Sequence, residues 1–159
     1  MGSLKGVFPV IPTPFTDDGR YVDYGNFEEL VEMAVRDGAH ALCLFAAGAE
    51  FYKLTMEERK ELFQRAINAN RGRLPIIATV SSHATVLAVR EAVYYEKKGA
   101  SALNIMPPGF GAPSQNMVAE HLTEISNAVS IPVIIQYAPA LNGMALAAET
   151  FGKISENQT

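Results

Sequence analysis

The sequence has few of the features that mark several large classes of protein. Its single cysteine, Cys43, excludes an internal disulfide and a cysteine-based zinc site, and fits a reducing compartment. Lysine and arginine total 13 against 17 aspartate and glutamate residues, which leaves no basic excess for nucleic-acid phosphates. No apolar run approaches the roughly 20 residues that span a bilayer, and residues 1–5 lack a signal peptide's apolar stretch. We therefore expect a cytoplasmic protein that binds neither nucleic acid nor membrane.

Motifs for phosphate and metal binding are also missing. No glycine-rich segment ends in Lys-Ser or Lys-Thr, so a P-loop is excluded, and no HExxH motif or carboxylate cluster indicates a metal. We expect no cofactor and no metal. The length of 159 residues suits one domain with a real core, but falls short of the roughly 200 to 250 residues of a complete (β/α)8 barrel.

Five short runs of the sequence are almost continuously apolar. This pattern is typical of parallel strands that are buried on both faces, because half-exposed strands alternate apolar and polar residues instead. The runs cover residues 7–11, 41–45, 76–80, 102–106 and 133–137.

Helical patterns lie between these runs and have recognisable ends. Asn26 is a candidate N-cap of the first helix, and Gly38 ends it. Thr55 and Glu58 form a capping box at the start of the second. The other helices are expected over about 84–98, 117–129 and 147–155.

A weak internal repeat indicates how these elements are connected. Residues 38–42 resemble residues 99–103, and residues 74–77 resemble residues 131–134. Strand and helix therefore alternate with a period of about thirty residues, which predicts a chain of βαβ units and an α/β fold. Ligands of such folds bind outside the carboxyl ends of the strands, so the loops there are the candidate functional segments.

Three segments carry a family resemblance along essentially the whole chain. Residues 6–15 read GVFPVIPTPF, residues 50–59 read EFYKLTMEER, and residues 113–115 read PSQ. They resemble the dihydrodipicolinate synthase and N-acetylneuraminate lyase family. The resemblance implies a (β/α)8 barrel, of which residues 1–159 would be the first five strands and helices, an incomplete barrel domain with no second domain.

The resemblance also implies a function. Enzymes of this family join or cleave a carbon–carbon bond through a lysine Schiff base to pyruvate or another 2-keto acid, in which the protonated imine withdraws electrons from the neighbouring carbon. The partner implied is therefore a small 2-keto acid. The full-length proteins are usually homotetramers, so a homo-oligomer is expected.

The substrate-binding loop after the second strand departs from the family pattern Gly-Thr-Thr-Gly-Glu. The corresponding residues read Ala-Ala-Gly-Ala-Glu, so Ala47 and Gly48 replace the two threonines. The backbone N–H groups of Ala47, Gly48 and Ala49 can still bind a carboxylate, but the hydroxyl groups are gone. Glu50 is a candidate base, although a role in opening this loop and bonding its backbone is the stronger hypothesis.

Three more family positions differ in this chain. Gln136 takes the position of the proton-shuttling tyrosine, and it is either a ligand-facing residue or a polar residue lining the barrel. Phe110 corresponds to the tyrosine contributed across a subunit interface, and Leu141 to the arginine that holds the second substrate. These changes favour a divergent relative over dihydrodipicolinate synthase itself.

The family places its Schiff-base lysine on the sixth strand, after the fifth helix. None of the six lysines of this chain lies inside a predicted strand, so the Schiff-base lysine is absent and the chain alone is expected to be inactive. The main hypothesis is the first part of a Schiff-base lyase or aldolase. The alternatives are a non-catalytic relative that binds a small carboxylate or regulates, and a half-barrel involved in assembly or folding.

The remaining reactive residue types have structural interpretations. His83 begins a loop-to-helix junction, where a capping role is expected. His40 and His121 are expected at the surface, and Cys43 as an inert side chain within a buried strand.

Overall fold

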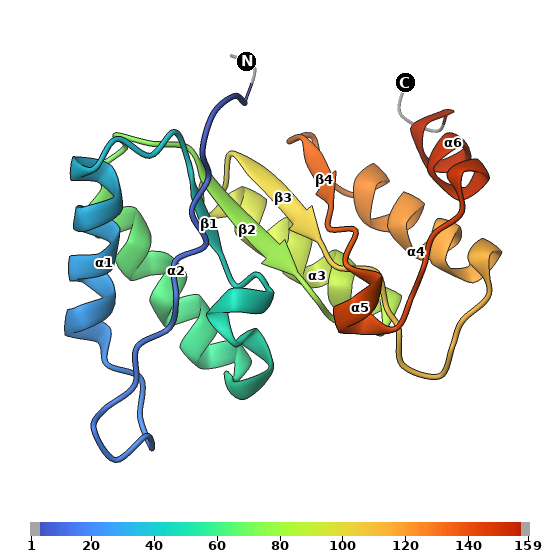
Figure 1. The fold of residues 1–159 in the computed structure, drawn as a ribbon. Helices are drawn as coiled ribbons and strands as arrows, with labels where there is room; N and C mark the ends of the chain where they lie inside the picture. The colour runs from blue at the N-terminus through green and yellow to red at the C-terminus, as the bar shows by residue number, and fades with distance from the viewer. Residues whose placement is uncertain (1–3, 157–159) are drawn as a thin grey trace. The chain divides into compact units, whose positions relative to one another are not determined.

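The computed structural model describes residues 4–156, so Met1–Ser3 at the N-terminal end lie outside the described residues. Four strands are assigned: β1 (Leu42–Leu44), β2 (Ile76–Val80), β3 (Ala102–Ile105) and β4 (Val133–Ile135). Hydrogen bonds join them into a parallel sheet with the order β1-β2-β3-β4, and helices alternate with them along the chain (Figure 1). The predicted α/β class and parallel strands are confirmed.

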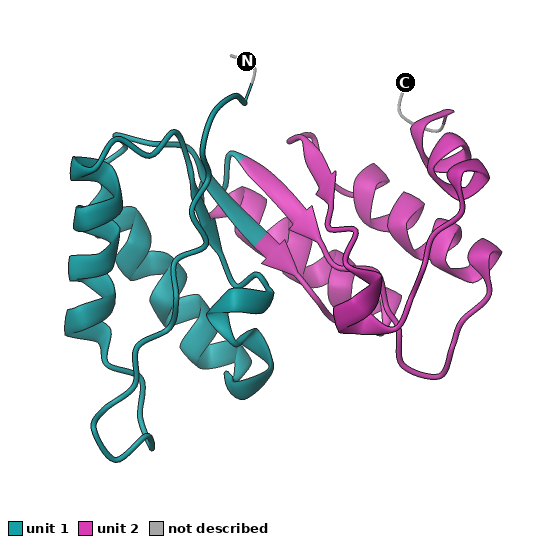
Figure 2. Cartoon of the chain, in the orientation of Figure 1, with its two compact units in different colours: residues 1–78, 99–101 teal, residues 79–98, 102–159 magenta. Residues whose placement is uncertain are grey.

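The chain forms two compact units (Figure 2). Unit 1 comprises residues 1–78 and 99–101, and unit 2 comprises residues 79–98 and 102–159. The boundary falls within β2, whose first three residues belong to unit 1 and whose last two belong to unit 2.

Unit 1 packs two helices beside β1. Helix α1 (Tyr24–Arg36) and helix α2 (Met56–Asn70) lie side by side, and α1 buries Phe27 and Val31 (Figure 1). The N-cap of α1 is Asp23, whose side chain accepts a hydrogen bond from the Asn26 N–H group, so the prediction of Asn26 as the cap is wrong by three residues. The predicted end is confirmed, because Gly38 follows the C-cap with a φ of 84°.

The first predicted strand, residues 7–11, is an extended segment along β1 rather than an assigned strand. Cys43 donates its N–H to the Pro9 carbonyl at 3.0 Å, and Ile11 donates to the Cys43 carbonyl at 2.9 Å. Only Val10 forms a bridge with Cys43. Pro9 and Pro12 explain this, because a proline has no N–H group with which to extend a ladder.

Unit 2 continues the same alternation. Helices α3 (Thr85–Lys97), α4 (Gln115–Asn127) and α6 (Ala148–Glu156) agree with the predicted helices to within about two residues, and α4 packs against both α3 and α6. A four-residue helix, α5 (Pro139–Asn142), follows β4 and was not predicted. The residues of β4 are only half-buried, whereas those of β3 are buried throughout, because β4 forms an edge of the sheet.

The capping box at the start of α2 is present as predicted. Thr55 Oγ1 accepts from the Glu58 N–H at 3.2 Å, and Glu58 Oε2 accepts from the Thr55 N–H at 2.8 Å. Two backbone donors that lack partners within the helix are therefore satisfied by one reciprocal pair.

We expect Thr55→Ala to lower the free energy of unfolding by about 1 kcal/mol, because the Glu58 N–H group loses its acceptor. Urea denaturation of the two proteins measures the difference. Thr55→Ser is the matched control, since serine keeps the hydroxyl, and it should stay close to the wild-type value. Equal stability of the alanine and serine variants would contradict the role of the cap.

Candidate functional site

The carboxyl ends of three strands in unit 2 carry a connected polar cluster. Asn104, the third of the four residues of β3, donates one hydrogen bond from Nδ2 to Thr79 Oγ1 on β2 at 3.0 Å. It donates another to Gln136 Oε1, directly after β4, at 2.8 Å. Thr79 is fully buried and Asn104 is 7% exposed, while Gln136 is half-buried. We call these three residues the amide cluster.

The backbone holds Gln136 in register beside β3. The Gln136 N–H group donates to the Ile105 carbonyl at 2.8 Å, so the residue continues the ladder one position past β4. Tyr137, the next residue, is 53% exposed, and its ring lies 5.8 Å from that of Phe151. As strand alternation requires, Tyr137 does not take the place of Gln136 in the cluster.

Asn104 and Thr79 were not singled out from the sequence as site residues. Both lie inside apolar runs. The amide of Asn104 within the otherwise apolar run Ala102–Ile105 is a signal in the sequence from which the cluster could have been predicted. A buried amide needs hydrogen-bond partners, and polar residues on neighbouring strands are the natural ones.

The loop after β1 in unit 1 is a 3-10 turn, η1 (Ala47–Ala49). The Ala49 N–H group is already used, because it donates to the Ala46 carbonyl at 2.8 Å. The N–H groups of Ala47 and Gly48 lie at the start of the turn, where backbone donors have no partner within the helix. Thr13 Oγ1 donates to the Ala49 carbonyl at 2.8 Å and so ties the turn to the preceding loop.

Glu50 ends this turn in the left-handed conformation, with φ 54° and ψ 37°. Its carboxylate lies 2.5 Å from the Nζ atom of Lys53, which belongs to the next 3-10 turn, η2 (Phe51–Lys53). The hydrogen bond that Lys53 donates to the Glu50 carboxylate raises the pKa of Lys53, since it favours the charged amine.

Phe110 and Leu141 lie on surface segments of unit 2. Phe110 is 91% exposed and Leu141 is 70% exposed. The two segments are joined at their bases, because Asn142 Nδ2 donates to the Pro107 carbonyl at 3.0 Å. Gly109 passes so close to the Asn142 carbonyl that a Cβ atom there would lie 1.6 Å from its oxygen. A residue with a side chain cannot occupy position 109 without a shift of this loop.

His121 is buried, so the expectation of a surface position is wrong. Its side chain is 5% exposed, and Nδ1 lies 2.9 Å from Thr85 Oγ1 at the start of α3. Burial lowers the pKa of His121, and the nearby His83 lowers it further. His83 itself is exposed, with its ring 6.4 Å from that of Phe110, and the N-cap position of α3 is held by Ala84.

The expected positions of two other residues, one at the surface and one in a buried strand, are confirmed. His40 is exposed, and its Nδ1 atom accepts a hydrogen bond from the Val7 N–H group at 3.1 Å. Cys43 is a buried residue of β1.

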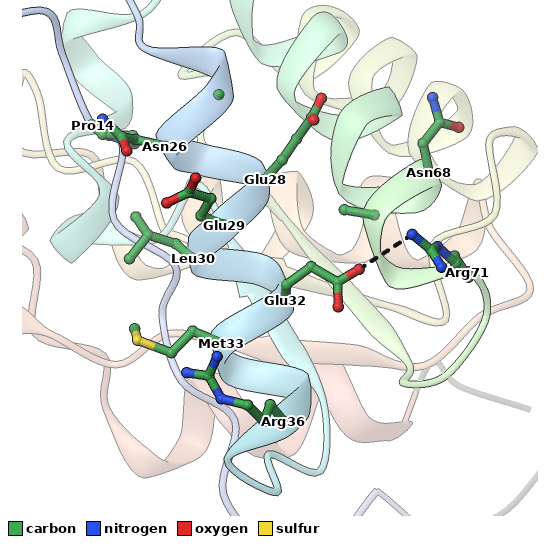
Figure 3. A pocket seen from close by; sticks show the side chains of 12 residues that line it. Pro14, Asn26, Glu28, Glu29, Leu30, Glu32, Met33, Arg36, Asn68 and Arg71 are labelled. Carbon is green, nitrogen blue, oxygen red and sulfur yellow. Dashed lines mark ion pairs between the residues drawn. The ribbon is translucent and has the colours of Figure 1, made fainter.

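A hollow of about 1010 Å³ lies on unit 1 between α1 and the end of α2, and Pro14 also lines it (Figure 3). Glu32 on its wall pairs with Arg73 at 2.8 Å and with Arg71 at 3.8 Å, and the hydrogen bond from Arg73 lowers the pKa of Glu32. Because the carboxylate already has cationic partners, we interpret the hollow as a junction between two helices rather than a ligand site.

Neither a metal-binding cluster nor a membrane-spanning helix is present within residues 4–156. Histidine, cysteine and carboxylate side chains form no group of three or more that could hold a metal ion there. No helix in that range has the length and apolar character needed to cross a membrane.

Parallel strands with alternating helices, and a polar cluster at the strand ends, are the features of the (β/α) barrel class. The sequence pattern of the dihydrodipicolinate synthetase family matches residues 3–159, and the chain belongs to this family. It is 30% identical over 157 residues to a 4-hydroxy-tetrahydrodipicolinate synthase of Thermoanaerobacter sp., covering 99% of this chain and 52% of the relative. It is also 30% identical over 154 residues to the L-2-keto-3-deoxyarabonate dehydratase of Azospirillum brasilense, covering 95% of this chain and 49% of that enzyme.

Solved structures agree with this relationship. Dihydrodipicolinate synthase from Aquifex aeolicus is 28% identical and has a TM-score of 0.89 over 95% of this chain and 51% of its own. The chloride-inhibited dihydrodipicolinate synthase from Acinetobacter baumannii, crystallised with pyruvate, is 28% identical with a TM-score of 0.91, covering 97% of this chain and 53% of its own. The predicted partial barrel is confirmed, and the chain spans about half the length of the relatives it matches.

The buried His121 makes stability depend on pH in a defined direction. Its pKa is lowered in the folded state, so the unfolded chain takes up a proton first as the pH falls through about 6.5. The contribution of the neutral His121 side chain to the free energy of unfolding is complete above that pH and decreases below it. We expect the free energy of unfolding to fall less between about pH 7.5 and pH 5 in His121→Gln than in the wild type.

Urea denaturation at the two pH values measures these slopes. Asn127→Gln is the control, because it changes an exposed, uncharged residue of the same helix and leaves every histidine in place. If His121→Gln has the same slope as the wild type, the buried imidazole is not the group responsible.

Proposed function

We propose that this chain provides the first five βα units of a lyase that acts on pyruvate or a related 2-keto acid through a lysine Schiff base. The amide cluster is the observation that carries the proposal, because it puts hydrogen-bonding groups at the strand ends of an otherwise apolar sheet. Membership of the family supports the reaction class. A relative crystallised with pyruvate and another that is a keto-deoxyarabonate dehydratase support the 2-keto acid.

In this proposal, the lysine that forms the imine lies on a strand outside the five units. An amine attacks a keto group only in its neutral form, so a Schiff-base lysine needs a lowered pKa. Lys53 is the only described lysine in a strand-end loop, and Glu50 raises its pKa instead. Lys60, Lys97 and Lys153 lie on helices, and Lys98 caps α3.

Each unit has its own candidate substrate-binding groups, Gln136 in unit 2 and the turn Ala47–Ala49 in unit 1. Gln136 offers an amide, and Ala47 and Gly48 offer backbone N–H groups, which are suitable donors for carboxylate oxygens. Phe110 and Leu141 line the rim of unit 2, where their exposure leaves them open to a second substrate or a neighbouring subunit. In the proposed enzyme, Gln136 binds the 2-keto acid while the lysine forms the covalent bond.

A second function, binding of a small carboxylate without catalysis, is favoured by one observation. Gln136 stands where the family has a proton-shuttling tyrosine, and a carboxamide neither gains nor loses a proton near neutral pH. A relative of this kind would bind a small carboxylate and act as a regulator. The two functions share the ligand and differ in whether an imine forms.

Calorimetric titration of the chain with pyruvate, followed by borohydride reduction and mass spectrometry, tests the proposal. We expect reversible binding of pyruvate and no reduced adduct on any of the six lysines. L-Lactate is the matched control ligand, because it has the same carboxylate but no keto group, and it should bind more weakly.

Two results would contradict this account. An adduct on a lysine of this chain would mean that the imine-forming amine has been wrongly excluded. Failure of pyruvate and of longer 2-keto acids to bind at all would remove the proposed substrate class.

A further inference from the structure

The hydrogen bonds that Asn104 donates fix the orientation of the amide groups in the amide cluster. Its Nδ2 group has two N–H bonds, and each has an acceptor, Thr79 Oγ1 at 3.0 Å and Gln136 Oε1 at 2.8 Å. The oxygen of the Gln136 side chain is therefore engaged. The Nε2 end of the same side chain carries two donors, and none of residues 4–156 provides an acceptor for it.

The cluster is rigid where it is buried and accessible at one end. Thr79 and Asn104 lie on strands within the core of unit 2, at 0% and 7% exposure. Gln136 is half-buried, and its backbone N–H group is fixed to the Ile105 carbonyl at 2.8 Å. An amide that is fixed at its oxygen and accessible at its nitrogen is a preorganised hydrogen-bond donor.

We propose that Asn104 is a positioning residue that turns Gln136 so that its Nε2 group donates to an oxygen of the bound 2-keto acid, with Thr79 anchoring Asn104. This inference rests on the proposed function for its ligand. Asn104 acts through Gln136 and does not itself touch the ligand. The arrangement selects ligands with a hydrogen-bond acceptor at this point, such as a carboxylate or keto oxygen, and disfavours ligands whose group there can only donate.

The substitution Asn104→Asp tests the direction of the cluster. The aspartate oxygen in place of Nδ2 can only accept, so it binds the Nε2 group of Gln136 and reverses that side chain. The oxygen of Gln136 then faces the ligand and repels a carboxylate. We expect pyruvate to bind about ten- to a hundredfold more weakly, the range for loss of a hydrogen bond to a charged group.

The measurement is a titration of the ¹⁵N-labelled chain with pyruvate, followed by NMR. In the wild type, the side-chain NH₂ signals of Gln136 should shift with pyruvate, and those of Asn104 should move little. Gln136→Met keeps the length of the side chain without its donors and should weaken binding to a similar extent. Thr79→Val removes only the anchor of Asn104, and we expect a loss of about two- to tenfold.

Asn70→Asp is the matched control, because it makes the same change in another buried amide. Asn70 is 2% exposed, belongs to unit 1, and bonds the backbone of Leu74 at the end of α2. It should lower stability without changing the affinity for pyruvate. The backbone spectrum of each variant shows whether it is folded, and if Asn104→Asp is not, Thr79→Val and Gln136→Met carry the test.

The outcomes separate this inference from the proposed function. Unchanged affinity in a folded Asn104→Asp would overturn the positioning role, and unchanged affinity in Gln136→Met would overturn the contact of Gln136 with the ligand. In both cases, binding of pyruvate by the wild type would still support the proposed substrate class. If pyruvate shifts no signal of the wild-type chain, the proposed function fails and this inference falls with it.

Discussion

A buried amide on β3 links the packing of unit 2 to its chemistry. Moving an amide from water into surroundings that offer no hydrogen-bond partner costs several kcal/mol. Asn104 therefore requires hydrogen-bond partners, and both neighbouring strands provide them. Thr79 and Gln136 meet that requirement, and this constrains the side chains at the ends of β2 and β4 together. The apolar strands around them exclude water and so strengthen each of these hydrogen bonds.

The departures from the family pattern gather at positions where the family uses hydroxyl groups and charge. Ala47 and Gly48 leave only backbone donors in the loop after β1, and Gln136 offers donors without an ionisable proton. Both changes keep the capacity to hold an oxygen atom and remove the capacity to move a proton. We propose that residues of this kind bind 2-keto acids without exchanging protons with them.

The local features of the fold could be predicted from the sequence, and the long-range ones could not. Thr55 and Glu58 of the capping box are three residues apart, and the apolar runs and helical periodicities were sufficient to locate the sheet and the five helices α1, α2, α3, α4 and α6. The error at the start of α1 arose because Asp23 and Asn26 are both good caps, and only the bond between them decides which one acts. Helix α5 has four residues, too few for any periodicity.

The missed site residues depend on partners distant in the sequence. Asn104 lies 25 residues from Thr79 and 32 residues from Gln136, and His121 lies 36 residues from Thr85. A histidine on a helix has the same pattern whether it faces solvent or a neighbouring helix, so its burial became visible only in the fold. Gln136 could be predicted because the family resemblance, rather than its own chemistry, marked the position.

The central claim is that this chain carries the substrate-holding part of a Schiff-base lyase whose lysine lies on a further strand. The most direct measurement joins residues 1–159 to the C-terminal half of the Acinetobacter baumannii relative, incubates the fusion with pyruvate and borohydride, and maps any adduct by mass spectrometry. The account predicts one adduct, on a strand lysine of the added half, whose formation at low pyruvate concentration requires Gln136. A fusion that folds, binds pyruvate and forms no adduct would contradict the account and leave a protein that binds without catalysing.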